Sequence, residues 1–106
     1  MPDIYTISQL KSVLSPVFAR YGVRSAVLFG SYGKGVADAK SDIDLLVDSG
    51  LRGLRFVALL DDVQTALHKD VDLLDVRHIQ SGSKIDREIQ KTGVAVYGEV
   101  TGYGRD

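Results

Sequence analysis

Apolar residues recur at helical spacing from position 7 to position 21, and this pattern predicts an amphipathic helix. The apolar positions are Ile7, Leu10, Val13, Leu14, Val17, Phe18 and Tyr21. Thr6 and Gln9 have the spacing of a capping box at the start of this helix, and Gly22 supplies a stop at its end. Because Pro16 lies inside the periodic stretch, we expect a kink within one helix rather than two separate helices.

Three short apolar runs predict buried strands. The first covers residues 25 to 29 and breaks at Gly30 and Ser31, which is typical of a strand that ends in a tight turn. Residues 32 to 40 contain two glycines and two lysines with little periodicity. They predict a loop with room for one helical turn.

The other two runs cover residues 42 to 48 and 71 to 76. In the run from 42 to 48, side chains alternate between an apolar face and a face that begins with two carboxylates. The apolar face holds Ile43, Leu45 and Val47, and the opposite face holds Asp42, Asp44 and Leu46. Residues 94 to 97 predict a short edge strand near the end of the chain.

Two further helices are predicted. One covers residues 54 to 67, about four turns, where apolar residues return roughly every three positions. These residues are Leu54, Val57, Leu60, Val63 and Leu67. The other helix begins after Ser81 or Ser83, either of which can cap it, continues to about Lys91 and ends at Gly93.

The predicted order is therefore helix, strand, strand, helix, strand, helix and short strand, with no internal repeat or linker. This order indicates a single α/β (α+β) domain in which helices pack against a mixed sheet of about four strands. We expect the domain to cover residues 1 to 98. Residues 99 to 106 contain several glycines and no apolar pattern, so they predict a mobile C-terminal tail.

Composition and charge narrow the classes of function. The chain has 106 residues, enough for one domain, and its 13 Lys and Arg against 14 Asp and Glu give no general attraction to nucleic acid or anionic lipid. The absence of cysteine excludes disulfides, thiolate metal sites and cysteine nucleophiles. No apolar run approaches the ~20 residues of a membrane span. We therefore expect a cytoplasmic protein that binds neither membranes nor, directly, nucleic acid.

Three aspartates form the most informative pattern. Asp42 and Asp44 are two positions apart on one predicted strand, so their side chains point the same way, and Asp72 lies on the next strand. Carboxylates held side by side repel one another, which favours a bound cation. Oxygen ligands without a cysteine or histidine cluster indicate Mg²⁺ or Mn²⁺ rather than Zn²⁺. Such an ion commonly shares substrate phosphates, which makes a nucleoside triphosphate the natural ligand.

The turn after the first strand supplies groups suited to phosphate. Gly30 lets the backbone approach closely, Ser31 offers a hydroxyl and an amide hydrogen, and Lys34 can offset triphosphate charge. If the third strand lies next to the second, Asp72 completes a trio of carboxylates. It could then take a proton from an attacking hydroxyl or ligate a second metal ion.

These motifs resemble the minimal nucleotidyltransferases of the DNA polymerase β superfamily. The similarity rests on Leu-Phe-Gly-Ser-Tyr-Gly-Lys-Gly, then Ser-Asp-Ile-Asp-Leu-Leu-Val, then Val-Asp-Leu-Leu, and it covers roughly residues 7 to 98. The resemblance implies a polymerase β-like domain in which Asp42 and Asp44 hold two Mg²⁺ ions and Asp72 holds the catalytic one.

The same resemblance gives the nucleotide-binding residues. Gly30 and Ser31 would grip the terminal phosphates of ATP. Lys34 stands where many relatives have arginine, which keeps the charge but loses bidentate phosphate geometry, so its role is less defined.

Small members of this family are commonly paired with a helical ribonuclease toxin of the HEPN type. The resemblance implies that the chain acts as the antitoxin by adding AMP from ATP to a hydroxyl, expected to be a tyrosine, of that toxin. Two alternatives stay open: neutralisation by complex formation with weak chemistry, and transfer to a small molecule such as an aminoglycoside. A homo-oligomer or hetero-oligomer is compatible with each.

Several other polar residues point to ordinary structural roles. His68 and His78 have no partner at metal-ligand spacing and are expected at the surface. Asp75 is expected to be a solvated edge residue. Tyr32 could stack on a base or pack in the core, and the arginines form no compact run.

Overall fold

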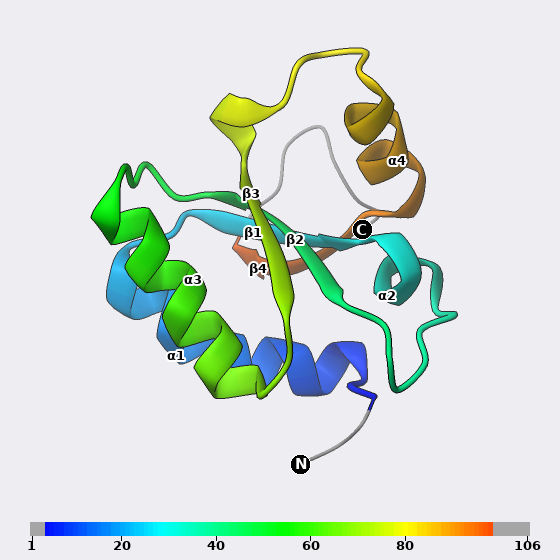
Figure 1. Ribbon diagram of the computed structural model, residues 1–106, viewed down its shortest axis with the longest axis horizontal. Helices are drawn as coiled ribbons and strands as arrows, with labels where there is room; N and C mark the ends of the chain where they lie inside the picture. The colour runs from blue at the N-terminus through cyan, green and yellow to red at the C-terminus, as the bar shows by residue number, and fades with distance from the viewer. Residues whose placement is uncertain (1–3, 99–106) are drawn as a thin grey trace.

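The computed structural model describes residues 4–98 and shows helices on both faces of one sheet (Figure 1). The predicted tail, residues 99 to 106, lies outside the described residues, as do residues 1 to 3. The elements are α1 (Ile7–Tyr21), β1 (Ser25–Phe29), α2 (Gly30–Lys34), β2 (Ile43–Asp48), α3 (Leu54–Leu67), β3 (Val71–Asp75), a short 3-10 helix (Val76–His78), α4 (Lys84–Thr92) and β4 (Val94–Gly98).

The sheet is mixed and has four strands, as predicted, and their order is β3-β2-β1-β4. β1 pairs antiparallel with both β2 and β4, whereas β2 and β3 run parallel. As a result, the N-terminal ends of β2 and β3 lie beside the C-terminal end of β1. This edge collects the residues on which the functional predictions depend.

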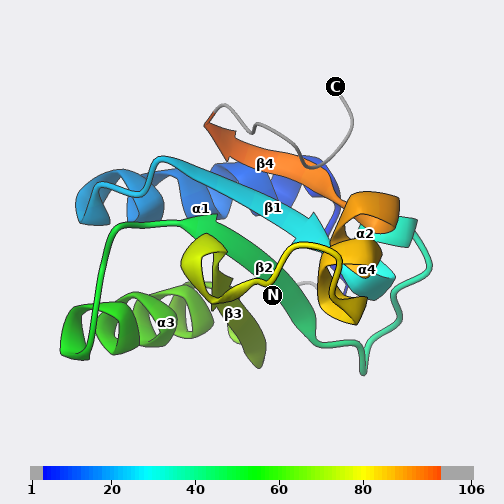
Figure 2. The same ribbon diagram turned by 90° about the horizontal axis from the view of Figure 1, so that it is seen from above.

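The two faces of the sheet are covered differently. α1 and α3 pack on one face, while α4 and α2 lie together at one end of the molecule (Figure 2). Ile43, Leu45 and Val47 join the large core under α1 and α3, and Leu46 joins a smaller core with Ile89 of α4. The predicted alternation of β2 is therefore confirmed. No helix in the described part of the chain is long and apolar enough to cross a bilayer.

The first helix has the predicted start and stop. The side chain of Thr6 accepts a hydrogen bond from the Gln9 amide at 3.0 Å, and Oε1 of Gln9 accepts one from the Thr6 amide at 2.8 Å. Gly22 ends the helix in the left-handed conformation, with φ of 69°. The helix continues through Pro16 as one element.

α3 has the predicted bounds, and its predicted buried face is correct for Leu60, Val63 and Leu67 but wrong for its first turn. Leu54 and Val57 are 85% and 56% exposed, whereas the buried positions are Leu59, Val63 and Leu67. A strict three-residue repeat falls short of a full turn and drifts by about 60° per step around a helix of 3.6 residues per turn. The first members of the predicted stripe therefore leave the core, and the face defined by steps of four residues is buried instead.

Asp75 is buried, so the prediction that it is a solvated edge residue was wrong. Only 2% of it is exposed, and its carboxylate accepts hydrogen bonds from the hydroxyl and the amide of Ser49, the latter at 3.3 Å. Its second oxygen accepts from the Arg77 amide at 3.2 Å. These bonds satisfy the buried carboxylate and connect the end of β3 to the segment that follows β2.

The helical turn allowed for in the predicted loop is present as α2, which follows β1 directly. Two strand boundaries differ from the predictions. β2 begins at Ile43, which places Asp42 just before the strand, and β3 ends at Asp75. Of the two candidate caps for α4, Ser83 is the one whose hydroxyl accepts from the Asp86 amide, at 3.2 Å.

Candidate active site

The parallel pairing of β2 with β3 places two of the predicted carboxylates side by side. Asp44 and Asp72 are register partners, each the second residue of its strand, so their side chains leave the same face of the sheet. Asp42 precedes β2 on the same alternation. Asp42 and Asp72 are exposed and Asp44 is half-buried. The three aspartates therefore gather at one open edge of the sheet.

Asp44 is the carboxyl group whose pKa this edge changes most clearly, first through burial and then through its charged neighbours. Burial, then the neighbouring charge of Asp72 and a side-chain hydrogen bond with it, raise the pKa of Asp44 to about 6. The charges of Asp42 and Glu88 raise this pKa further. A carboxyl group with several like-charged neighbours is the environment in which a cation is most strongly stabilised.

The carboxylates at this edge are the candidate ligands for a divalent metal ion. Among residues 4–98, no group of three or more histidine or acidic side chains lies close enough together in this structure to hold a metal ion. The chemistry nevertheless fits, because the gathered donors are carboxylate oxygens, which Mg²⁺ and Mn²⁺ prefer, and because a cation would relieve the repulsion at Asp44. His68 and His78 are both exposed, as expected.

Gly30 lies directly against Asp44. Its preceding residue, Phe29, is the register partner of Asp44 in the antiparallel pair. A Cβ on Gly30 would stand 2.2 Å from Oδ2 of Asp44, and Gly30 has φ of 70°, in the left-handed region. Both the space and the conformation therefore require glycine here. Ser31 follows Gly30 as the second residue of α2.

Two residues of α4 complete this edge, and the sequence patterns did not reveal either of them. The side chain of Thr92 accepts a hydrogen bond from the Gly30 amide at 3.1 Å. Nζ of Lys34 lies 3.6 Å from Oε1 of Glu88, so α4 also holds the charged end of α2. The one available signal was that Glu88 and Thr92 are four residues apart, on one face of a predicted helix.

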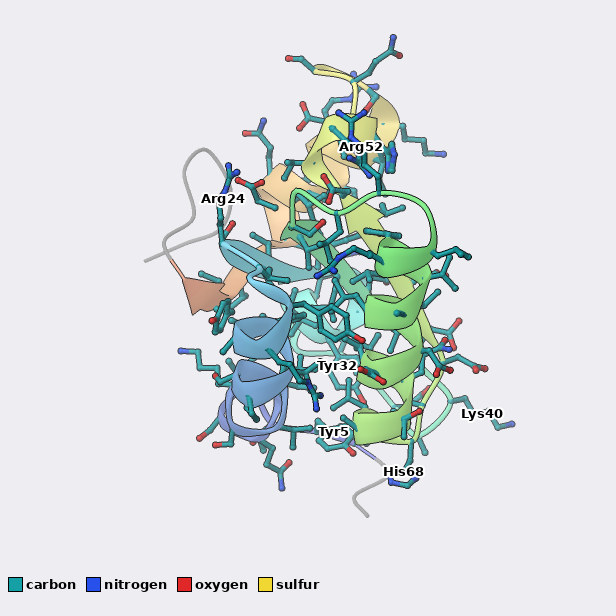
Figure 3. The ribbon with its side chains drawn as sticks, turned by 90° about the vertical axis from the view of Figure 1, so that its left-hand side faces the viewer. Tyr5, Arg24, Tyr32, Lys40, Arg52 and His68 are labelled. Carbon is teal, nitrogen blue, oxygen red and sulfur yellow. The ribbon has the colours of Figure 1, made fainter. Side chains whose placement is uncertain are left out.

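Tyr32 packs in the core and is not available for stacking on a base. It is 4% exposed and lies between α1 and α3 near Tyr5, whose amide donates to its hydroxyl at 3.4 Å (Figure 3). Arg24 and Arg52 lie at separate places on the surface in the same view, which agrees with the absence of a compact basic run in the sequence.

The raised pKa of Asp44 predicts how stability depends on pH in the metal-free protein. The carboxyl has a pKa of about 6 in the fold against an ordinary 3.8, so its neutral form is favoured by folding. Its contribution is full below pH 3.8 and is lost as the pH rises through 6. Because the group is partly solvated, we expect the loss to be about 1 kcal/mol, well under the unscreened value.

This prediction is checked by thermal unfolding with a chelator at pH 5 and pH 8. Between these conditions the wild type should lose about 2 °C relative to Asp44→Asn, because roughly half of the loss has already occurred at pH 5 and Asp44→Asn has no carboxyl to titrate at this position. Parallel shifts of the two melting curves would contradict it.

The fold and the carboxylate edge define the class of this protein. A family model described as "Polymerase beta, Nucleotidyltransferase" matches residues 12–100. The chain belongs to the polymerase β nucleotidyltransferase family. Within that family it groups with the minimal nucleotidyltransferases, as two curated relatives show.

The first relative, from Methanocaldococcus jannaschii and named provisionally as a protein adenylyltransferase, is 35% identical over 75 residues, which are 69% of this chain and 81% of the relative. The second, protein adenylyltransferase MntA of Thermococcus cleftensis, is 34% identical over 85 residues, 73% of this chain and 84% of the relative. The similarity thus extends over most of each relative.

Solved structures show the same fold. A toxin-antitoxin structure with AMP-PNP superimposes with a TM-score of 0.68 at 26% identity, covering 84% of this chain and 73% of that one. A complex of a tri-AMPylated Shewanella oneidensis HEPN toxin with its MNT antitoxin gives 0.64 at 23% identity, covering 89% and 74%. The polymerase β-like architecture predicted from the sequence is confirmed.

Proposed function

We propose that this chain transfers AMP from ATP to a hydroxyl, expected to be a tyrosine, of a HEPN-type toxin, and thereby acts as its antitoxin in the cytoplasm. The observation that carries the proposal is the register of Asp44 with Asp72 beside the Gly30–Ser31 turn. Two relatives of this chain are named protein adenylyltransferases, and a structural neighbour contains an ATP analogue, which supports the choice of nucleotide.

The site residues divide into two groups. Asp42, Asp44 and Asp72 would hold the divalent metal, two Mg²⁺ ions by resemblance with Mn²⁺ as a substitute. When bound, these ions supply positive charge that neutralises the triphosphate and the charge that develops during transfer. In the turn that contacts Asp44, Ser31 would offer its hydroxyl and amide to the terminal phosphates, and Gly30 leaves room for that approach.

The transfer step forms one bond and breaks one. The acceptor hydroxyl oxygen bonds to the α-phosphorus of ATP, the bond from that phosphorus to the bridging oxygen breaks, and pyrophosphate leaves. The acceptor proton must go to a base. Asp72 is exposed at this edge, and in this proposal it either receives that proton or ligates a metal ion.

The role of Lys34 in this proposal is limited by its ion pair with Glu88. Its ammonium group is 3.6 Å from Glu88, and both side chains are partly exposed. A triphosphate that approaches the Gly30–Ser31 turn would compete with Glu88 for this charge. We therefore assign Lys34 to the offset of phosphate charge, with Glu88 as its partner between turnovers.

The openness of the site indicates that a second protein supplies the acceptor. Asp42 and Asp72 are exposed at the edge of the sheet, and α4 covers its face only from one end (Figure 2). A bound toxin can bring a hydroxyl to such an edge and exclude water from it at the same time. The exposed carboxylate edge therefore favours a hetero-oligomer of the chain with its toxin.

The test mixes the purified chain with Mg²⁺, ATP labelled at the α-phosphate and a HEPN-type toxin, the partner that the proposal names. We expect label on that protein, loss of its ribonuclease activity, and no label when a chelator is added. Neutralisation without label would favour a binding antitoxin instead. Label on an aminoglycoside but not on the protein would favour a small-molecule transferase.

A further inference from the structure

Thr92, the last residue of α4, makes two hydrogen bonds through one hydroxyl. Its Oγ1 donates to the carbonyl of Glu88 at 2.8 Å and accepts from the Gly30 amide at 3.1 Å. Thr92 is 8% exposed, so these bonds are shielded from water. The first bond is a common one within a helix, whereas the second joins residues 62 positions apart in the chain.

The backbone of Thr92 also touches α2. A Cβ on Gly33 would stand 2.2 Å from the carbonyl oxygen of Thr92, so the two backbones are in direct contact at this glycine. α2 and α4 lie side by side in both ribbon views (Figures 1 and 2). The end of α4 therefore fixes α2 at two points, Gly30 and Gly33.

Gly30 has no side chain with which to fix its own orientation. Its left-handed conformation is one of several open to glycine, and the hydrogen bond from its amide to Thr92 selects this one. That conformation sets Gly30 against Oδ2 of Asp44 and directs Ser31 along the same edge. A chain of contacts thus connects Thr92 to the metal-binding carboxylate through the phosphate-binding turn.

We propose that Thr92 is a positioning residue for nucleotide binding: by accepting from the Gly30 amide, it holds the Gly30–Ser31 turn in the orientation that receives the triphosphate beside Asp44. This inference rests on the proposed function. It also means that the Gly30 amide is engaged within the protein, so Ser31 is the residue of this turn that donates to phosphate.

The test compares Thr92→Val, which keeps the shape of the side chain and removes the hydroxyl, with Thr92→Ser, which keeps the hydroxyl. Thr65→Val is the matched control, because Thr65 is exposed on α3 on the opposite side of the sheet. AMP-PNP affinity is measured by calorimetry with Mg²⁺, the KM for ATP and kcat by label transfer to the partner, and folding by thermal melting.

We expect Thr92→Val to weaken AMP-PNP binding and raise the KM for ATP by about tenfold, the factor that one shielded hydrogen bond accounts for. Thr92→Ser should bind within about twofold of the wild type, and Thr65→Val should be unchanged. A lowered melting temperature with unchanged affinity and KM would overturn the proposal, as would equal losses in Thr92→Ser and Thr92→Val.

The wild type separates this inference from the function on which it rests. If the wild type binds AMP-PNP and labels its partner while Thr92→Val does both equally well, the positioning role alone fails. If the wild type neither binds AMP-PNP nor transfers label, the proposed function fails and the positioning role with it.

Discussion

Asp44→Asn is expected to reduce AMP transfer by about a thousandfold or more, because it removes the charge of a proposed metal ligand from the carboxylate edge. Loss of metal-based charge stabilisation is worth several kcal/mol in the transition state, and each 1.36 kcal/mol is a factor of ten in rate. Label transfer from ATP to the partner measures the effect.

The same substitution should leave the fold intact. Asparagine has the shape of aspartate, and the charge of Asp44 is a source of repulsion from Asp72 and Asp42 in the metal-free protein. At pH 8 the variant should melt at the wild-type temperature or above it. An active Asp44→Asn, or one that unfolds, would contradict the assignment.

Asp48→Asn is the matched control. Asp48 is on the same strand and the same alternation as Asp44, but at the opposite end, where it faces Arg24 at 3.9 Å. Removing this partly exposed charge should change both activity and stability little, since such surface pairs contribute 1 kcal/mol or less. Equal loss in both variants would indicate a general charge effect rather than a site.

Gly30→Ala should reduce transfer by roughly a hundredfold, through geometry rather than charge. The new Cβ would stand 2.2 Å from Oδ2 of Asp44, so the carboxylate or the turn must move. A displacement of about 1 Å at a reacting site can cost about 100-fold in rate. Transfer kinetics and a crystal structure of the variant test this.

Gly35→Ala separates the two costs of that change. Gly35 also has a positive φ, 77°, but a Cβ there would meet nothing within 4 Å. In both variants, alanine in a conformation of positive φ costs about 1 kcal/mol of stability. Only Gly30→Ala also displaces the Asp44 carboxylate. If Gly35→Ala loses as much activity as Gly30→Ala, the close approach to Asp44 is not what matters.

The sequence was sufficient for the sheet and for the gathering of carboxylates. Alternation on β2 predicted the side on which Asp44 emerges, whereas the position of β3 beside β2 was only a condition of the sequence argument. The pairing of β2 with β3 then places the third carboxylate: because the two strands are parallel and their first residues are paired, Asp72 lies opposite Asp44. These are local patterns and simple topology, which a single sequence displays.

The residues that the sequence did not reveal depend on contacts between distant elements. Nothing local in α4 says which of its faces meets α2, so the bonds of Thr92 and Glu88 to that helix could not be foreseen. Asp75 was misplaced for a similar reason. An aspartate at the end of a strand is usually solvated, and only the packing of Ser49 against it makes burial favourable.

That buried aspartate has a consequence for the chemistry at the other end of its strand. A slip of one residue between β2 and β3 would turn Asp72 toward the apolar core and leave Asp44 without its neighbour. Such a slip would also break the bonds that Asp75 makes to Ser49, stranding a carboxylate away from water. The hydrogen bonds of Asp75 thus favour the strand register in which Asp72, on the same strand, lies opposite Asp44 at the edge of the sheet.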